Sequence, residues 1–551
     1  MNAYCDRCGD STGHNNGATQ FLRKYQESTI TWIISEGLLW DMEEREDVLV
    51  LAVVTLRHKI RRHLNEVSAA EQSEFYQRLI IYIKCAASNG MKQLFIQLSV
   101  VIADLLLRLK LNGMLMEVIM TSLFEEAPTA LCQLLKVLPL EAMHLGEKQQ
   151  LEDESKELMQ CLIWLQNRTD LDVTCLNRFC FLICASWSRA HLLSLEQLMS
   201  HKVIENAFLL MINPTLFEGE LCMEASECLV ALLEHVLHEK KYQSIDLNLE
   251  SRIFKFCCSI QFPISESESN LMKATAQLHI QMAETYACLH TVLPPGALLE
   301  QGPFCFELLL HVANHCDPDT IISSMPMWHK LFAQIPFRFE QKRCTLYYSI
   351  VARALDVFFK QCRLPNERLI LGSQACDTMT ELRNHVQDLL PHIGDLEEII
   401  TLKSLTDQLI YTAFGNQSHW MDIEASLFFL KPLIPKLLQQ HRQLIIQLIE
   451  NLPNYIIDPK IHPAVCQQII LLNTECHKCF DNQFLRHKFV SQLIGFRSHL
   501  GISPNDRDIL EVIIKSCNTL QGCRPSDLIS YEEEFRSLAE SLSNMPKEPT
   551  N

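Results

Sequence analysis

The chain has 551 residues, of which 48% are hydrophobic and 21% are charged, and its formal net charge is −18. This hydrophobic content is sufficient for a large buried core, and it differs from the composition of broadly disordered proteins. The negative charge argues against direct nucleic-acid binding, which needs a basic surface, and it suits basic partners instead. No apolar run reaches membrane-spanning length, so we expect no membrane insertion.

Residues 1–16 are polar and rich in Gly and Asn, and we expect them to be disordered. They include Cys5, Cys8 and His14, but a structural zinc site needs four ligands and no second pair lies close by. Cys476 and Cys479 form a similar lone pair, so we expect no bound metal. The 23 cysteines are scattered among apolar positions, a usage typical of reduced, buried thiols in a cytosolic or nuclear protein.

The first helices are predicted over Ala18–Ser28 and Ile30–Trp40, followed by Arg45–Leu64. The third helix carries its basic residues at its C-terminal end, namely Arg57, His58, Lys59, Arg61, Arg62 and His63. Two interpretations stay open. Cations at a helix C-terminus are favoured by the helix dipole alone, or Arg57, Lys59 and Arg62 contact an acidic partner.

The next predicted helix, Gln93–Lys110, is apolar around almost its whole circumference and must therefore be covered on several sides. Its clear polar positions are Gln97, Asp104 and Arg108. Neighbouring helices are predicted on both sides of it in the chain, over Glu71–Ala87, Met114–Phe124 and Pro128–Leu138, with a turn at Gly90.

Apolar helical segments then alternate with short polar breaks as far as about residue 500, and helix pairs recur about every 40–45 residues, which is the period of HEAT-type repeats. Breaks fall, for example, at Pro128, Pro318 and Pro463. Glycine is scarce, with 16 residues, which disfavours sandwiches and barrels. The predicted fold is an all-α HEAT-type solenoid, with one helix of each pair lining a concave surface for a protein partner. Separate helical bundles are the alternative.

Catalytic signatures are missing from the sequence. It contains neither a G-x-S-x-G elbow nor a Rossmann or P-loop pattern. His235 and His238 are three residues apart, whereas the metalloprotease motif H-E-x-x-H places its histidines four apart. We therefore expect no enzyme and no cofactor.

Several segments resemble the importin-β/exportin superfamily of nuclear transport receptors, and within it the transportins that import SR-type splicing factors. Leu56–Ile60 is similar to the family's Leu/Met-Lys-x-Lys-Ile, and Gln97–Leu105 to Gln-Leu-Ala-Leu-Ala-Ile-Ala-Asp-Leu. Leu134–Pro139 is similar to Ile-Leu-Thr-Val-Leu-Pro, and Trp420–Phe428 to Trp-x-x-x-Glu-Ala-x-Leu-Phe. Leu382-Arg383 fits the same register. These segments occur along residues 18–500, approximately, in the same order as in the family.

The resemblance implies Ran-GTP-regulated import of Arg/Ser-rich cargo, contact with nucleoporins, and shuttling between nucleus and cytoplasm. It implies importin-β-like repeats over 17–110 that would bind Ran, with Arg57, Lys59 and Arg62 as contacts. Further HEAT repeats would fill 111–502, and C-terminal helices and a frayed tail 503–551. The first family helix is replaced by residues 1–16, and the chain ends near the midpoint of a full-length receptor. A bidirectional importin, an exportin and a non-transport HEAT scaffold are the alternatives.

Overall fold

The computed structural model describes residues 20, 23–41, 43–109, 111, 113–168, 170, 172–213, 221–242, 247–263, 269–292, 302–334, 341–364, 374–395, 409, 411, 419–440, 442–443, 445–447, 462–479, 489, 493, 511–516 and 519. Every regular element within these ranges is helical, so the predicted all-α class is confirmed there. The predictions for residues 1–16, including Cys5, Cys8 and His14, lie outside them. The chain divides into two compact units, Met1–Thr285 and Tyr286–Asn551.

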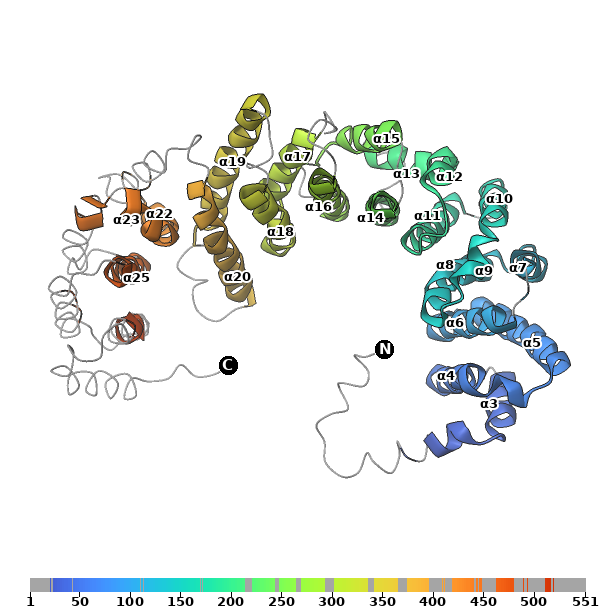
Figure 1. Ribbon diagram of the computed structural model, residues 1–551. Coiled ribbons are helices and arrows are strands. Elements are labelled where there is room, and N and C mark those ends of the chain that lie inside the picture. Colours follow the sequence, from blue (N-terminus) through green and yellow to red (C-terminus); the bar gives the residue numbers. More distant parts are fainter. Residues whose placement is uncertain are drawn as a thin grey trace. The chain divides into compact units, whose positions relative to one another are not determined.

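Unit 1 is built from helices that stack in chain order (Figure 1). Five of them pack successively side by side and are called the first row: α4 (Glu46–His63), α6 (Lys92–Leu109), α8 (Pro128–Leu145), α11 (Val173–Arg189) and α14 (Cys222–Tyr242). The second row covers one side of them and consists of α5 (Ala69–Ser88), α7 (Leu115–Leu123), α10 (Ser155–Gln166) and α13 (Lys202–Ile212).

Further elements of unit 1 are α3 (Thr31–Trp40), the 3₁₀ turn η1 (Leu64–Glu66), α9 (Lys148–Glu152), α12 (Leu195–Ser200), α15 (Leu247–Cys258) and α16 (Ser269–Val292), which contains the boundary between the units. Residues 23–27 are also helical. α3 precedes the first row and packs against α4.

The predicted apolar helix is α6, and it packs against α4, α5 and α8 as expected of a helix that needs cover on several sides. Leu98, Ile102 and Leu105 are fully buried. Asp104, which the sequence placed among the few polar positions, is also fully buried. A buried carboxylate needs partners, and those partners define the site described below.

Local sequence signals set several helix ends in unit 1. Ser68 and Glu71 form a reciprocal capping box at the start of α5, in which the Ser68 backbone N–H donates to the Glu71 carboxylate at 2.9 Å. Gly90 follows α5 with φ of 69°, a conformation that glycine adopts without strain, so the predicted turn is confirmed. Pro128 begins α8, where its missing N–H has no helical acceptor to lose.

α8 also holds a proline in its interior, Pro139. Because proline has no N–H, the carbonyl of Leu135 lacks its usual helical donor. The neighbouring helix supplies one: the Trp187 indole N–H of α11 donates to the Leu135 carbonyl at 2.9 Å. The Ser186 hydroxyl donates to the next carbonyl, that of Lys136, at 2.6 Å. Two side chains of α11 therefore join it to the backbone of α8.

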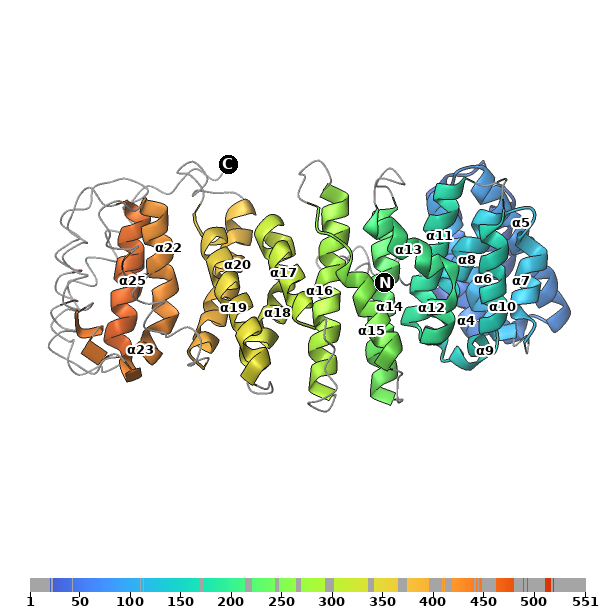
Figure 2. The same ribbon diagram turned by 90° about the horizontal axis from the view of Figure 1, so that it is seen from above.

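Unit 2 shows the same kind of packing, in which α17 lies on α19, α18 on α20, and α22 on α25 (Figure 2). Its elements include α17 (Gly302–His315), α18 (Pro318–Gln334), α19 (Gln341–Gln361), α20 (Gln374–Leu389), η5 (Leu390–Asp395), α22 (Trp420–Leu430), η6 (Lys431–Leu433), α23 (Ile434–Gln440) and α25 (Pro463–Cys479). Residues 511–516 are also helical. The breaks predicted at Pro318 and Pro463 are the first residues of helices. None of the described helices of the chain is both long and apolar enough to cross a membrane.

Candidate functional site

The three residues singled out in the sequence lie in different environments on α4. Lys59 is fully buried, and its Nζ lies 2.6 Å from Oε2 of Glu66 and 5.8 Å from the ring centroid of Trp32. The Trp32 indole N–H donates to the same carboxylate oxygen at 3.1 Å. Lys59 therefore ties α4 to α3 and to the turn after α4, and it is not available on the surface.

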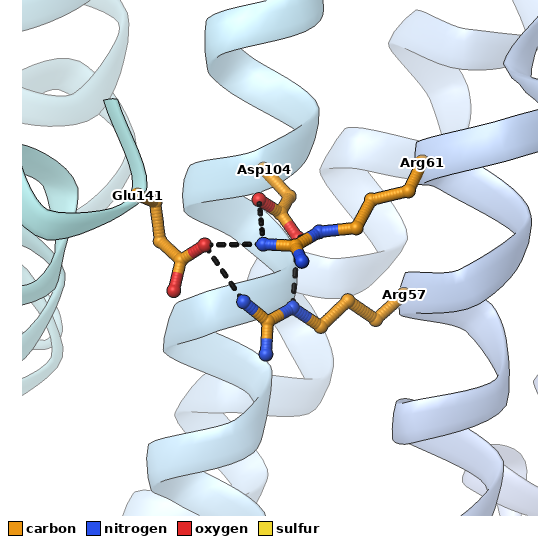
Figure 3. Close-up of polar contacts among 4 residues, drawn as sticks. All are labelled: Arg57, Arg61, Asp104 and Glu141. Carbon is orange, nitrogen blue, oxygen red and sulfur yellow. Dashed lines mark hydrogen bonds and ion pairs between the residues drawn. The ribbon is translucent and has the colours of Figure 1, made fainter. Parts of the chain in front are cut away.

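Arg57 and Arg61, one helical turn apart on α4, reach the same two carboxylates, Asp104 of α6 and Glu141 of α8 (Figure 3). Arg57 donates from Nε to Asp104 Oδ2 at 2.8 Å and from Nη2 to Glu141 Oε2 at 2.7 Å. Arg61 binds both oxygens of Asp104, at 2.7 and 3.1 Å, and Glu141 Oε2 at 2.6 Å. These four residues are called the ion-pair cluster, and they join three successive helices of the first row.

Burial and the neighbouring arginine charges shift the pKa values of the two carboxyl groups in opposite directions within the ion-pair cluster. Burial disfavours the charged form of Asp104, but hydrogen bonds and charges from Arg61 and Arg57 outweigh it, so the pKa of Asp104 lies below its ordinary value. Burial, together with the negative charge of Asp104, raises the pKa of Glu141. The side chains of Arg57 and Arg61 are 14% and 28% exposed, so the cluster lies at the edge of the core.

The sequence prediction missed Arg61, Asp104 and Glu141. Two signals were present in the sequence. Arg57 and Arg61 are four residues apart and therefore share a helix face. Asp104 is a lone carboxylate in an otherwise apolar helix segment, and such a group requires a buried cation.

Arg62, in contrast, is exposed. On the solvent side of the same helix lie His58, which is half-buried, and the apolar side chains Leu51 and Val54, which are 48% and 38% exposed. Burial and the positive charges of Arg62, His63 and Lys59 lower the pKa of His58, so its ring is neutral near pH 7. This part of α4 combines exposed apolar groups with one strong cation.

Apolar side chains are also exposed on the neighbouring helices of the first row. Ile96 on α6 is 39% exposed, and Leu140 and Met143 on α8 are 48% and 53% exposed. We call the exposed residues Leu51, Val54, Arg62, Ile96, Leu140 and Met143, together with half-buried His58, the α4–α8 surface. Exposed apolar side chains beside arginine and histidine are typical of protein-binding surfaces.

The described residues contain no group of three or more His, Cys, Asp or Glu side chains that could hold a metal ion. Cys476, one of the pair considered for zinc, is buried in α25. Burial raises the pKa of Cys362 and Cys466 to about 12, so these thiols stay protonated and are poor nucleophiles.

Two of the motifs in unit 2 meet in a second buried ion pair. Arg383 of α20 donates to both carboxylate oxygens of Glu424 in α22, at 2.5 and 3.1 Å, and the two side chains are 9% and 1% exposed. Arg383 also donates to the Cys362 carbonyl at 3.2 Å, and its guanidinium lies 4.1 Å from the ring centroid of Phe428. These residues therefore hold α20 and α22 together, and they are too buried to form a binding surface.

Comparison with known proteins gives distant relatives. No family model matches the chain. It is 23% identical over 482 residues to the mRNA transport regulator MTR10 of Saccharomyces cerevisiae, covering 80% of this chain and 47% of that protein. It is 21% identical over 473 residues to an uncharacterized protein of Schizosaccharomyces pombe, covering 79% and 48%. The chain thus spans about half the length of these curated relatives.

Among solved structures, importin 13 in its cytosolic state matches with a TM-score of 0.61 at 13% identity, covering 91% of this chain and 59% of that one. At this identity the likeness shows the fold, and the predicted all-α helical-repeat solenoid is confirmed as the fold class.

Proposed function

We propose that the chain acts as a nuclear transport receptor of the importin-β superfamily. The observation that carries the proposal is the agreement of two independent comparisons, one of sequence with MTR10 and one of fold with importin 13. The motifs of the transportins that import SR-type splicing factors favour Arg/Ser-rich cargo, and the net charge of −18 suits such basic proteins. The receptor would contact nucleoporins and move between nucleus and cytoplasm.

Ran in its GTP form would bind the α4–α8 surface. Support comes from its composition, since it combines the exposed cation Arg62 with exposed apolar residues on three helices that the ion-pair cluster joins. Arg57 would act by holding α4 to α6 and α8, and Lys59 by holding α4 to α3 and to the turn after α4, because each already binds an internal carboxylate. Arg62 is then the residue of the predicted set that would touch Ran.

The mechanism needs no covalent chemistry. Cargo and Ran-GTP would bind coupled parts of the helical stack, so that Ran-GTP in the nucleus lowers the affinity for cargo and releases it. Such coupling is reciprocal and requires that each partner prefers a different shape of the receptor.

Binding of the full chain to Ran loaded with GTP or GDP tests this proposal. We expect tighter binding to the GTP form, and Arg62→Glu should weaken that complex about tenfold, because it reverses a charge at the contact. Lys156→Glu is the matched control, since Lys156 is an exposed cation on α10 in the second row. Equal or absent binding of the two nucleotide forms would contradict the proposal, and equal effects of the two variants would remove Arg62 from the contact.

Direction of transport is tested separately by capturing an Arg/Ser-rich protein on the chain with and without Ran-GTP. Release by Ran-GTP means import, whereas a gain of cargo means export. A scaffold that does not bind Ran would capture the same amount of cargo with and without Ran-GTP.

A further inference from the structure

Two methionine side chains in the described part of the chain are exposed, and they are exposed equally. Met143 of α8 and Met114, which directly precedes α7, are both 53% exposed. Met143 belongs to the α4–α8 surface, whereas Met114 lies at the start of a second-row helix. Other methionines, such as Met116 and Met282, are buried. One of two equally accessible thioethers therefore lies on the surface proposed to bind Ran.

Exposed thioethers react with peroxides without first losing a proton. The sulfur of Met143 would attack one oxygen of hydrogen peroxide, so that an S–O bond forms and the O–O bond breaks. The second oxygen leaves as hydroxide and takes up the proton of the first, which gives water. The sulfur is thereby oxidised by two electrons and the peroxide is reduced. Buried thiols such as Cys362 and Cys466 are shielded and protonated, and Cys175 is an exposed thiol whose effect the variants below separate from that of Met143.

Oxidation would change the character of the α8 part of the α4–α8 surface. A sulfoxide turns a flexible apolar side chain into a polar one. Leu140 precedes Met143 by three residues, so the two share a face of α8, and Leu140 is 48% exposed. A partner that covers this apolar pair would have to bury the S=O dipole, which costs free energy unless the partner supplies a hydrogen-bond donor. Oxidation of Met143 therefore opposes apolar contact on α8.

We propose that Met143 is a site of reversible oxidation by peroxides, and that its sulfoxide weakens binding at the α4–α8 surface. Because Ran-GTP is the partner affected, this regulation rests on the proposed function. Reduction of the sulfoxide by a thiol-dependent reductase restores the thioether and with it the apolar contact. Met114 has the same chemistry and the same exposure but lies outside the α4–α8 surface, so it serves as an internal control.

Peptide mass spectrometry of the full, folded chain after a brief treatment with hydrogen peroxide tests the modification itself. We expect sulfoxide at Met143 and Met114 to similar extents, because their exposures are equal, and little at the buried Met116 and Met282. A Met143 side chain that stays reduced under these conditions would overturn the proposal. This readout does not depend on Ran.

Binding of the full chain to Ran-GTP, measured before and after peroxide treatment, tests the consequence. We expect the native chain to lose about fivefold in affinity and to regain it after treatment with methionine sulfoxide reductase and a thiol. Met143→Leu, compared with itself before treatment, should show no loss, since leucine has a similar volume and no sulfur. Met114→Leu is the matched control and should lose affinity as the native chain does. Equal losses in the two variants would overturn the proposal and point to another group such as Cys175.

A glutamine substitution tests the same effect without peroxide. Met143→Gln places a polar group of similar length at this position and should weaken Ran-GTP binding, whereas Met114→Gln should leave it unchanged. A chain that binds Ran-GTP equally before and after oxidation contradicts the regulation alone. Absence of Ran-GTP binding to the untreated chain contradicts the proposed function, and the regulation falls with it.

Discussion

At the scale of single residues, the ion-pair cluster shows how a charge can be misjudged when it is considered alone. Arg57 looks like a surface cation at a helix end, but in the structure it binds two carboxylates that are 47 and 84 residues away in the chain. Such pairs form only after α4, α6 and α8 have stacked. The sequence therefore identified which end of α4 carries the basic residues, but it did not identify their partners.

His191 is a second residue whose environment arises from packing. It follows α11 with φ of 55°, its ring stacks on His238 of α14 at a centroid distance of 3.4 Å, and its Nδ1 lies 2.8 Å from Nδ1 of His235. Burial, and after it the positive charge that His238, His235 and Lys148 can carry, lowers the pKa of His191 from 6.5 to about 3.

This environment predicts a loss of stability in acid. Because the unfolded chain takes up the proton near pH 6.5 and the folded one only near pH 3, the unfolded state binds more protons between these values, and stability falls as the pH is lowered through that window. For a half-exposed ring we expect a loss on the order of 1 kcal/mol.

His191→Asn should reduce this loss, since asparagine tolerates positive φ and does not titrate. The measurement is the urea midpoint, followed by circular dichroism, near pH 7 and near pH 5. An unchanged pH dependence in the variant would show that other groups cause it.

At the scale of elements, the junction between α8 and α11 gives a reason for the Leu134–Pro139 motif. Pro139 leaves the Leu135 carbonyl without its usual helical donor, and the Trp187 indole N–H of α11 donates to that carbonyl instead. The Leu135 carbonyl therefore loses a hydrogen bond within α8 and gains one between α8 and α11.

A double-mutant cycle tests this exchange. Trp187→Phe should destabilise the protein by about 1–3 kcal/mol more than its lost packing, because a buried carbonyl is left without a donor. In a Pro139→Ala background, Ala at 139 supplies the helical N–H, and the same Trp187→Phe change should be less harmful. The coupling is measured from urea unfolding. Equal effects of Trp187→Phe in both backgrounds would contradict this account.

Element boundaries were predicted closely where local signals are strong. The predicted Gln93–Lys110 is α6, Lys92–Leu109, and the predicted Arg45–Leu64 is α4, Glu46–His63. The helix from Pro128 was predicted only to Leu138, yet α8 continues through Pro139 to Leu145. The proline looks like a stop in the sequence, whereas in the structure the Trp187 indole of α11 supplies the hydrogen-bond donor that the proline lacks.

At the scale of the whole molecule, stability in a stack of repeats is a sum of local terms, because each repeat contacts its neighbours. The buried Arg383–Glu424 pair is suited to a test of this property. Burial outweighs the attraction of Arg383, so the pKa of Glu424 lies above its ordinary value. Removal of the arginine would leave this carboxyl buried without its positively charged partner.

We expect Arg383→Met to destabilise α20 and α22 by about 3–5 kcal/mol, and a second change, Glu424→Leu, to recover much of the loss. Hydrogen exchange should show lost protection in these helices of unit 2, while α6 and α8 in unit 1 keep theirs. Loss of protection in both units would mean that the molecule unfolds as one cooperative body.

The sequence by itself determined the helical class, the approximate limits of the helices and the repeat period, since these follow from local apolar periodicity and from capping residues. The tertiary structure alone decided which charges are available. It buried Lys59, engaged Arg57 and left Arg62 exposed, although all three lie within six residues of one another on α4. The physical reason is that burial and ion pairing depend on the neighbouring helices, and stacking brings those helices together from distant parts of the chain.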